Sequence, residues 1–396
     1  MKKRLLVLTS TFPRWKHDAT PAFVARFCEE VADSFEAVRV LAPHAKGAKS
    51  KERDGSIHVR RYRYFYPASQ ENIAYEGGAV GKISKNPLYL FKLFCLLSSL
   101  FLSTLVTVVT KRVSVVNAHW IIPQGFVAVL VKYLTGTKVI VTVHGSDIFA
   151  LKGKTMSKIK RFVLKRADAV IVNSSATLSA CKEVYAKGNY HVIPVGVDTE
   201  RFQPRPKQQG LIKKFGLNDF TVLYVGRLSD EKGVIYLLRA LKKLQDKEVA
   251  FKALIVGDGW MRKELEKYAE ENNLVDNVIF TGWVKAEDMA GYFNTADVFV
   301  GPSLREAQGL VFAEALFTGL PVIATTVGGI PDIVIEGKTG FLVSPKSDEE
   351  IYAKLLKLHD DSALREKLGE NGKRHVRDKF SWQSVEERFT ALVGTL

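Results

Sequence analysis

Residues 303–321 read SLREAQGLVFAEALFTGLP and follow a short β-branched and aromatic run at residues 298–300. The run predicts a strand that ends at Gly301-Pro302, and the apolar spacing after it predicts a helix that begins near Gln308. A strand, a short loop and a helix in this order are the repeating unit of a parallel sheet covered by helices.

The same pattern extends along the whole chain. We expect strands at residues 4–10, 37–42, 57–64, 113–118, 138–144, 168–173, 190–194, 221–226, 251–257, 277–282, 298–302, 321–326 and 340–343. Because apolar strands separated by helices form parallel sheets buried on both faces, the fold class is α/β. Each half of the chain shows the pattern independently, which predicts two doubly wound domains.

The joint between the halves is expected at residues 198–210, where Pro204 and Pro206 interrupt the apolar pattern. A length of 396 residues suits two domains. We therefore expect an N-terminal domain over residues 1–200 and a C-terminal domain over residues 201–379.

Composition excludes several classes of protein. The chain is 46% hydrophobic and 25% charged, which is the balance of a folded globular protein. Its cysteines, Cys28, Cys95 and Cys181, form no CxxC pair, so the sequence excludes a disulfide scaffold and a zinc finger. Only a short apolar run follows the basic start, too short for a signal peptide, and we expect a cytoplasmic protein.

The charge of the chain is distributed unequally. Residues 1–204 carry 31 Lys and Arg against 14 Asp and Glu, a net charge of +17, whereas the remainder carries −1. A one-sided basic domain implies a polyanionic partner, either nucleic acid or an anionic membrane surface. The alternative is a basic surface that only keeps the protein soluble.

Two segments of the basic half favour the membrane. Residues 93–110 carry no charge and predict a domain helix with one face toward lipid, or else a short span. Residues 152–166 contain seven basic and no acidic side chains, with Met156, Ile159 and Val163 on one helical face. This pattern is typical of an interfacial helix, or of a solvated face above three core residues. We expect peripheral contact with an anionic membrane at the inner face of the cell membrane, and no nucleic acid.

Residues 303–321 also predict an anion site. Backbone N–H groups of Gly309, Leu310 and Val311 would be unpaired at the start of the helix. At the C-terminal edge of a sheet such groups bind anions, most often a phosphate. Glu306 precedes the helix and Glu314 lies in its second turn. Because carboxylates repel phosphate, we expect one to accept hydrogen bonds from ribose hydroxyls and the other from sugar hydroxyls.

A second motif supplies the opposite charge. Residues 224–233 read YVGRLSDEKG, in which a predicted strand ends at Gly226. Arg227 and Lys232 would then stand at the same sheet edge as the anion site. A bidentate donor and a point charge suit a diphosphate, so the two motifs together predict a nucleoside-diphosphate site.

The GRLxxxKG motif at residues 226–233 and the pair Glu306 and Glu314 resemble glycosyltransferase family 4, a group of retaining enzymes that use nucleotide sugars. The resemblance covers essentially the whole chain, with supporting matches at residues 192–198, 257–259, 281–284 and 327–329. It implies the GT-B architecture, in which two Rossmann-like domains face each other across a cleft. It also implies that a last helix, residues 380–396, crosses back to the first domain.

By this resemblance Arg227 and Lys232 neutralise the diphosphate, Glu314 binds the ribose and Glu306 binds the transferred sugar. The main chain at residues 282–284 borders the base. The residues expected to contact the nucleotide sugar are Arg227, Lys232, Trp283, Val284, Glu306, Gly309, Leu310, Val311 and Glu314.

In the first domain, residues 143–147 (VHGSD) resemble the family segment that places a histidine, here His144, beside the donor sugar. Asp147 either contacts sugar or acceptor or caps the following segment. His119-Trp120 also resembles a family pattern, which we interpret as mostly architectural. The candidate catalytic residues are His144, Arg227, Lys232 and Glu306.

The sequence departs from the family pattern at two places. Residues 11–21 lack the Gly-Gly pair that many relatives carry after the first strand, so Arg14, Lys16 and Asp18 are only candidates, Asp18 on the acceptor side. Ala307-Gln308 stands where a Gly-Phe pair usually follows the first glutamate, and Gln308 is expected to alter which sugar hydroxyls are recognised.

The resemblance implies a front-side displacement in which the leaving diphosphate helps to deprotonate the acceptor hydroxyl. The sequence shows no Ser–His–Asp or Cys–His arrangement and no DxD-like pair at a strand end, so we expect neither an enzymic nucleophile nor a metal. The donor is expected to be a UDP- or GDP-linked hexose, and the acceptor a lipid-linked or growing glycan in cell-envelope or polysaccharide biosynthesis. The alternatives are an epimerase or phosphorylase of the same fold, and a non-catalytic polyanion-binding protein.

Overall fold

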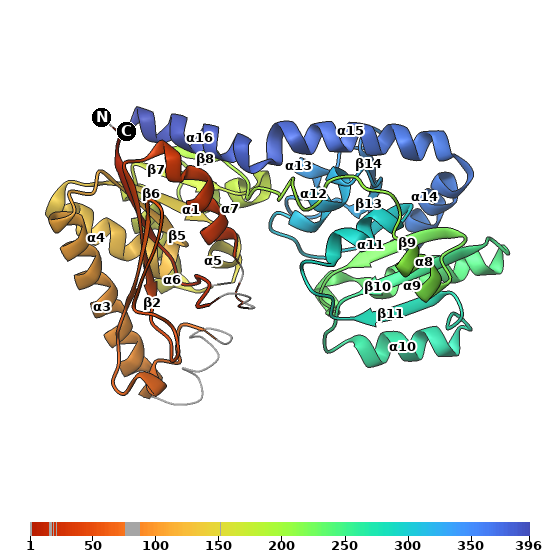
Figure 1. The fold of residues 1–396 in the computed structure, drawn as a ribbon, viewed down its shortest axis with the longest axis horizontal. Coiled ribbons are helices and arrows are strands. Elements are labelled where there is room, and N and C mark those ends of the chain that lie inside the picture. The colour runs from red at the N-terminus through yellow and green to blue at the C-terminus, as the bar shows by residue number, and fades with distance from the viewer. Residues whose placement is uncertain (1, 16–17, 19, 21, 76–87, 151) are drawn as a thin grey trace. The chain divides into compact units, whose positions relative to one another are not determined.

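The computed structural model describes residues 2–15, 18, 20, 22–75, 88–150 and 152–396. They form two compact units (Figure 1). The N-terminal unit comprises Met1–Pro194 and Val385–Leu396, and the C-terminal unit comprises Val195–Ser384. Each unit contains one sheet with helices packed on it, which confirms the α/β class.

The sheet of the N-terminal unit is parallel except at one edge. Its strands run in the order β3-β4-β2-β1-β5-β6-β7-β8. Their bounds are β1 Arg4–Leu8, β2 Ala37–Pro43, β3 Lys51–Asp54, β4 Ile57–Tyr62, β5 Val115–His119, β6 Lys138–Val143, β7 Ala169–Val172 and β8 Tyr190–Val192. The antiparallel edge strand β3 was not expected, because its sequence, KERD, is polar and carries no apolar signal.

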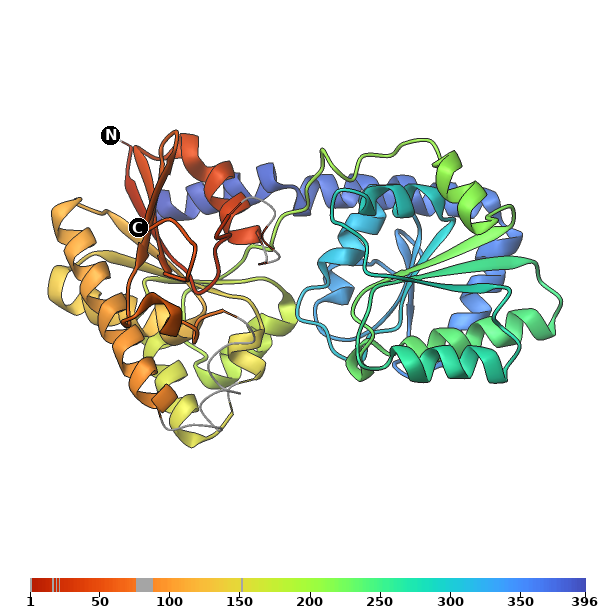
Figure 2. The same ribbon diagram turned by 60° about the horizontal axis from the view of Figure 1, so that its bottom comes forward.

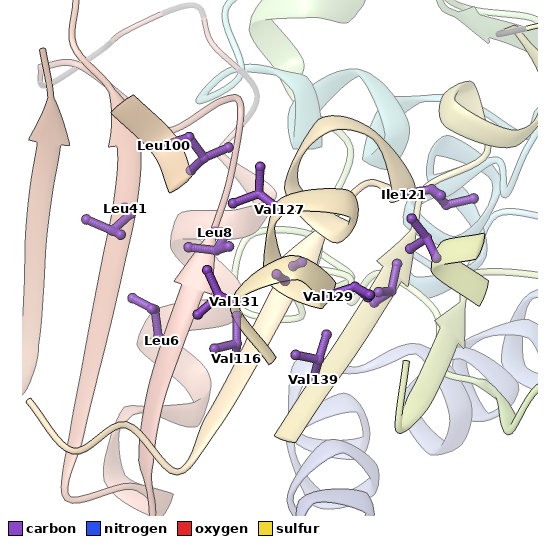
Figure 3. Close-up of a cluster of buried hydrophobic side chains, with 14 of the residues drawn as sticks. Leu6, Leu8, Leu41, Leu100, Val116, Ile121, Val127, Val129, Val131 and Val139 are labelled. Atoms are coloured by element: carbon purple, nitrogen blue, oxygen red, sulfur yellow. The ribbon is translucent and has the colours of Figure 1, made fainter. Parts of the chain in front are cut away.

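Helices cover this sheet, and apolar side chains fill the space between them. Their bounds are α1 Phe23–Val31, α3 Leu88–Thr110, α4 Phe126–Thr135, α5 Ser146–Phe149, α6 Lys154–Arg166 and α7 Ser175–Val184. Helices α3 and α4 lie side by side (Figure 2). Leu6 and Leu8 of β1 meet Leu100 of α3 and Val127 of α4 in the core beneath them (Figure 3).

Helix α6 differs from the interfacial helix that the sequence suggested. Val163 and Leu164 belong to the core, and Met156 and Ile159 are partly buried. Lys160 is also buried and donates to the carbonyl oxygen of Ile148 at 2.7 Å. The apolar face of α6 is therefore at least partly covered by protein, which favours the alternative of a solvated face above core residues for residues 152–166.

The sheet of the C-terminal unit is parallel throughout the pairs described, in the order β11-β10-β9-β12-β13-β14. Its strands are β9 Phe220–Val225, β10 Phe251–Val256, β11 Val278–Gly282, β12 Val298–Gly301, β13 Val322–Thr325 and β14 Gly340–Val343. Its helices are α8 Gln209–Phe215, α9 Val234–Asp246, α10 Arg262–Glu271, α11 Met289–Thr295, α12 Leu310–Phe317, α13 Ile330–Ile333, α14 Asp348–Asp360 and α15 Ser362–Phe380.

The last helix, α16 (Trp382–Thr395), belongs mostly to the N-terminal unit. Phe389 is fully buried, and its ring packs edge-on against Phe27 of α1 with ring centroids 4.8 Å apart. The N-terminal unit is thus assembled from two segments that are far apart in the sequence.

Candidate active site

The strand order of the C-terminal unit places its candidate residues at a topological switch point. From β9 the chain proceeds toward one edge of the sheet through β10 and β11, whereas β12 starts on the other side of β9. In such sheets ligands bind beyond the C-terminal ends of the strands where the order reverses. Here these ends carry the loop from Gly226 to Gly233 and the loop from Ser303 to Gly309.

These two loops touch each other. Gly233 has a φ of +62°, and a Cβ atom there would lie 2.2 Å from the carbonyl oxygen of Pro302. The amide of Leu304 also donates to the carbonyl oxygen of Glu231 at 2.7 Å. Only glycine allows this approach, which brings the ends of the two loops together.

The approach of the loops pairs two of the predicted site residues directly. Lys232 Nζ lies 2.6 Å from Glu306 Oε2, and both side chains are mostly buried. The sequence suggested no cation partner for Glu306, because the two residues are far apart in the chain. Arg227 belongs to the same loop as Lys232 and is exposed, and within the described residues it makes no ion pair.

Glycines also fix the backbone of Glu306. Gly328 has a φ of +59°, and a Cβ atom there would lie 1.6 Å from the carbonyl oxygen of Glu306. Gly309 has a φ of +89°, and a Cβ atom there would lie 3.1 Å from Glu306 Cγ. Residues 327–329, one of the supporting motifs, therefore pack directly against the backbone of the Glu306 loop.

Helix α12 begins directly after Gly309, and within the described residues no side chain caps it. The first amides of the helix and its dipole are thus not engaged by a capping side chain, which is compatible with the predicted anion site. Glu314 lies further along α12 and is partly buried. Burial raises the pKa of Glu314 to about 7; Arg201 opposes this effect and Asp198 adds to it.

Gln308 has a different role from the one expected. Its side chain is buried, its Oε1 accepts from the amide of Val195 at 2.9 Å, and its Nε2 donates to the carbonyl oxygen of Val195 at 2.9 Å. Both ends of the amide are thus used by one backbone residue. The expectation that Gln308 selects sugar hydroxyls is wrong, and Gln308 instead fixes the first residue of the C-terminal unit to the Glu306 loop.

Trp283 and Val284 follow β11 at the outer edge of the same sheet. The Trp283 side chain is 73% exposed, whereas Val284 is partly buried. Gly282 accepts a hydrogen bond from the amide of Gly257, so the loops after β10 and β11 also meet. An exposed indole at this edge presents a flat apolar surface to solvent.

In the N-terminal unit the switch point lies between β1 and β5, and His119 and Trp120 stand there. His119 Nδ1 lies 2.9 Å from His144 Nε2, and the two rings are nearly parallel with centroids 5.1 Å apart. Burial lowers the pKa of His144 to about 3 and lowers the pKa of His119 well below its usual range, with His144 adding to the second effect. Both imidazoles are therefore neutral at neutral pH.

A chain of hydrogen bonds fixes which nitrogen of each ring carries the proton. Thr142 Oγ1 donates to Asn117 Oδ1 at 2.8 Å, so Asn117 Nδ2 faces His119 Nε2 at 3.3 Å. An amide nitrogen only donates, so His119 Nε2 accepts and His119 Nδ1–H donates to His144 Nε2. Neutral His144 then carries its proton on Nδ1, which makes that atom a hydrogen-bond donor. The sequence missed this role of His119, although both histidines end adjacent strands.

The Asp147 carboxylate connects the two loops that carry these histidines. Its Oδ2 accepts from the amide of Ile121 at 2.8 Å, and its Oδ1 accepts from the amide of His144 at 3.2 Å. Burial raises the pKa of Asp147. Two roles were expected for Asp147, a contact with sugar or acceptor and a local cap. Because both of its oxygens accept from backbone amides, this geometry favours the local structural role.

Asp18 is similarly engaged. Both of its oxygens accept from the Arg14 guanidinium at 2.9 Å, and this pair holds the pKa of Asp18 well below its usual range. The Asp18 side chain is 1% exposed, so its carboxylate shapes the loop after β1. Lys16 lies outside the described residues. Across the described ranges, no group of three or more His, Cys, Asp or Glu side chains could hold a metal ion.

Two family models together match most of this chain. The family model described as Glycosyltransferase Family 4 matches residues 22–201, and that described as Glycosyl transferases group 1 matches residues 208–375. An uncharacterized glycosyltransferase of Methanocaldococcus jannaschii is 30% identical over 69% of this chain and 73% of its own length. A GDP-mannose-dependent alpha-(1-6)-phosphatidylinositol monomannoside mannosyltransferase of Mycobacterium tuberculosis is 30% identical over 66% of this chain and 71% of its own.

Solved structures share the fold over the full length. Sucrose-phosphate synthase from Thermosynechococcus elongatus superposes with a TM-score of 0.81 at 23% identity, over 100% of this chain and 99% of that chain. Anabaena HepE in complex with UDP superposes with a TM-score of 0.76 at 20% identity, over 100% of both chains. The fold is therefore that of the GT-B enzymes, and the chain belongs to glycosyltransferase family 4 and is a glycosyltransferase.

Proposed function

We propose that this glycosyltransferase moves a hexose from a UDP- or GDP-linked donor to a hydroxyl group of the acceptor, with retention of anomeric configuration. The observation that carries the proposal is the convergence of Lys232, Glu306 and the uncapped start of α12 at one switch point. Cations and free helix amides suit a diphosphate, and a neighbouring carboxylate suits sugar hydroxyls.

In this proposal Lys232 changes partner when the donor binds. Its ammonium group, 2.6 Å from Glu306 in the structure, would turn to the diphosphate together with Arg227. Glu306 would then accept hydrogen bonds from hydroxyls of the transferred sugar. Glu314 would bind the ribose, and the base would lie against Trp283 and Val284.

The chemical step would rely on charge stabilisation. As the bond between sugar and diphosphate breaks, negative charge grows on the departing diphosphate, where Lys232, Arg227 and the α12 amides would stabilise it. The leaving diphosphate would take the acceptor proton, so the reaction would require no enzymic nucleophile and no metal. His144 would contribute as a donor through Nδ1–H, because its neutral ring has no proton on Nε2.

The acceptor we propose is lipid-linked or a growing glycan, met at the cytoplasmic face of a membrane. The net charge of +17 over residues 1–204 supports an anionic surface. The mycobacterial relative is named for transfer to a phosphatidylinositol monomannoside. A Staphylococcus aureus relative, 29% identical over 68% of this chain and 74% of its own length, is named a capsular polysaccharide biosynthesis glycosyltransferase.

Thermal shift with UDP-, GDP- and ADP-sugars tests the donor site. We would measure the wild-type protein and Glu314→Ala, each with and without EDTA. We expect one nucleotide class to raise the melting temperature of the wild type and to have a much smaller effect on the variant. A shift that disappears with EDTA would refute metal independence, and an undiminished shift in Glu314→Ala would refute the ribose assignment.

A further inference from the structure

Helix α3 has one face packed on the sheet and an opposite face that is exposed and apolar. Its buried members are Lys92, Leu96, Leu100, Thr104, Thr107 and Val108. Its exposed large apolar members are Leu88, Leu90, Phe91, Phe94, Leu102, Val106 and Val109, all at least 48% exposed. The two sets lie on opposite sides of the helix, so the exposed set, at residues 88–94 and 102–109, forms an apolar surface, here called the α3 face.

The α3 face is part of a helix that is long and apolar enough to cross a bilayer by length and composition. However, its other side belongs to the core, where Leu96, Leu100 and Val108 pack. A span would expose that core, so the helix is suited to lie along an apolar surface. Tyr133 and Leu134 of the adjacent α4 are exposed too.

Threonine hydroxyls of α3 are satisfied within the helix. Thr104 donates to the carbonyl oxygen of Leu100, Thr107 to that of Ser103, and Thr110 to that of Val106, each at 2.7 Å. A hydroxyl that is already bonded to its own helix costs little to remove from water. These polar residues therefore do not oppose contact between the helix and hydrocarbon.

A basic cavity opens at the C-terminal end of α3. It measures about 520 Å³ and lies against β2, β3 and β4. Its cationic lining consists of Arg39, Lys51, Arg53, Arg60 and Lys111. The acid in the lining, Glu52, pairs with Arg61 at 2.6 Å. In the part of the chain that the structure describes, none of the five cations has an acidic partner within ion-pair distance.

Two residues that line the cavity show the effect of its excess positive charge. The Nε atom of Arg39 is buried and has no hydrogen-bond partner among the described residues. Burial lowers the pKa of His58, and Arg39, Arg53 and Lys111 lower it further. An anion in the cavity would remove this repulsion and would give Arg39 an acceptor.

We propose that this cavity binds the phosphate of an anionic phospholipid whose acyl chains lie in the bilayer against the α3 face. A free phosphate would satisfy the same cations, but it would leave the apolar surface beside them exposed to water. A lipid satisfies both at once, because its charged group and its chains are adjacent. This inference deepens the membrane contact in the proposed function by naming the surface and its ligand.

The location of the cavity separates it from the candidate active site. Helix α3 ends at Thr110 and the chain enters β5 at Val115, so this end of α3 lies near the edge of the sheet where parallel strands begin. His119 and His144 lie at the ends of β5 and β6, at the opposite edge. The bound lipid would therefore anchor the enzyme, and it would not itself receive the sugar.

Sedimentation with lipid vesicles tests the proposal. Vesicles of phosphatidylcholine would be compared with the same vesicles containing phosphatidylglycerol, using the full chain. We expect strong binding only with the anionic lipid. The double variant Arg53→Gln and Lys111→Gln should weaken partitioning roughly twentyfold, since each basic residue near an anionic surface contributes about a fivefold factor. The exposed pair Lys213→Gln and Lys263→Gln, in the C-terminal unit, is the charge-matched control and should behave like the wild type.

A second variant tests the α3 face. Leu102→Gln, Val106→Gln and Val109→Gln together replace exposed side chains and should reduce binding to anionic vesicles at least tenfold, with an unchanged melting temperature. Val275→Gln, at a position 54% exposed in the C-terminal unit, is the matched control. Equal binding of all variants would overturn the proposal. So would dimerisation in analytical ultracentrifugation that the triple variant abolishes, because a second copy would then cover the face.

Soluble ligands distinguish the source of the phosphate. Inorganic phosphate and glycerol 3-phosphate, added without vesicles, should move the NMR titration of His58 upward only weakly. Tight binding of either would assign the cavity to a soluble anion and overturn the lipid assignment. Nucleotide-sugar thermal shifts should be unchanged in all these variants. Failure of the lipid site would therefore leave donor binding intact, and failure of the donor site would leave vesicle binding intact.

Discussion

Lys232 and Glu306 form a pair that no local sequence pattern could reveal, since the residues belong to different loops. Their motifs were nevertheless recognisable separately, because each combines a strand end with a glycine and a charged side chain. The close contact between Gly233 and Pro302, which brings the two loops together, could not be predicted from the sequence. Charge type was thus predictable from the sequence, and pairing was not.

The first prediction concerns Lys232. Lys232→Ala should lower kcat about 100- to 1000-fold, the cost of losing one donor that stabilises charge in the transition state. It should also leave Glu306 partly buried without its cation, so donor binding should weaken as well. Steady-state kinetics with the identified donor measures both effects. Lys213→Ala, an exposed lysine of the same unit, is the control, and an unchanged kcat/KM in Lys232→Ala would remove Lys232 from the site.

Glu314 provides a prediction about pH. Its pKa is raised to about 7, so the carboxyl group is protonated below that pH in the free protein. Ribose hydroxyls donate to the ionised form. As the pH is raised toward 7, donor affinity should therefore increase by up to about tenfold per pH unit, and above pH 7 it should level off. Isothermal titration between pH 5.5 and about 8.5 measures this slope. Glu314→Gln should flatten it, and an identical slope in that variant would assign the titration to another group.

The His119–His144 contact provides a prediction about protonation. His144 should be neutral through the range in which an ordinary histidine titrates, with its proton on Nδ1. Long-range ¹H–¹⁵N NMR spectra distinguish the two tautomers directly. His119→Asn keeps a donor near the Nδ1 position and should preserve this tautomer of His144, whereas His119→Phe removes the donor and should allow both forms. A proton found on His144 Nε2 in the wild type would contradict the hydrogen-bond chain.

At the scale of elements, the apolar strands were predicted to within two residues at each end, because burial on both faces leaves an unambiguous apolar run. Strand β3 escaped prediction because it is a polar edge strand whose pairing partner, β4, supplies the apolar contact. Composition alone marked α6 and α3 as unusual helices of the basic half. The exposed apolar face expected for α3 is present, whereas packing was needed to show that the apolar residues of α6 lie against the core.

Gly328 tests how an element supports the site. Gly328→Ala would place a Cβ atom 1.6 Å from the carbonyl oxygen of Glu306, in addition to the strain of a φ of +59°. Gly337→Ala is a matched control, because its φ is +66° and no heavy atom lies within 4 Å of its Cβ position. Both variants should lose about 1–2 kcal/mol from backbone strain.

Only Gly328→Ala should lose more stability than this and also bind the donor more weakly. Thermal unfolding and nucleotide titration of the two variants measure the difference. Equal donor affinity in both variants would show that donor binding by the Glu306 loop does not depend on its close contact with Gly328.

At the scale of the whole molecule, each unit could be predicted as a doubly wound domain, and the return of the last helix followed from the family resemblance rather than from any local pattern. In the structure the two ends of the chain are tied together inside the N-terminal unit. Lys3 Nζ donates to the carbonyl oxygen of Val393 at 2.6 Å, and Arg388 donates to that of Val192. Stability of the N-terminal unit therefore depends on residues at the far end of the sequence.

Phe389 carries this dependence most directly. Its ring is fully buried and packs between Phe27 and Phe35, so Phe389→Ala should cost about 3–5 kcal/mol through the cavity that it leaves. Because the residue is in α16 but stabilises the N-terminal unit, the loss should appear in the unfolding of that unit. Differential scanning calorimetry with a saturating donor nucleotide separates the two units, since the nucleotide stabilises only the unit that binds it. Glu387→Ala, on the exposed side of the same helix, should leave both transitions in place. If Phe389→Ala lowered only the nucleotide-dependent transition, α16 would act on the C-terminal unit, and the assignment of Val385–Leu396 to the N-terminal unit would be wrong.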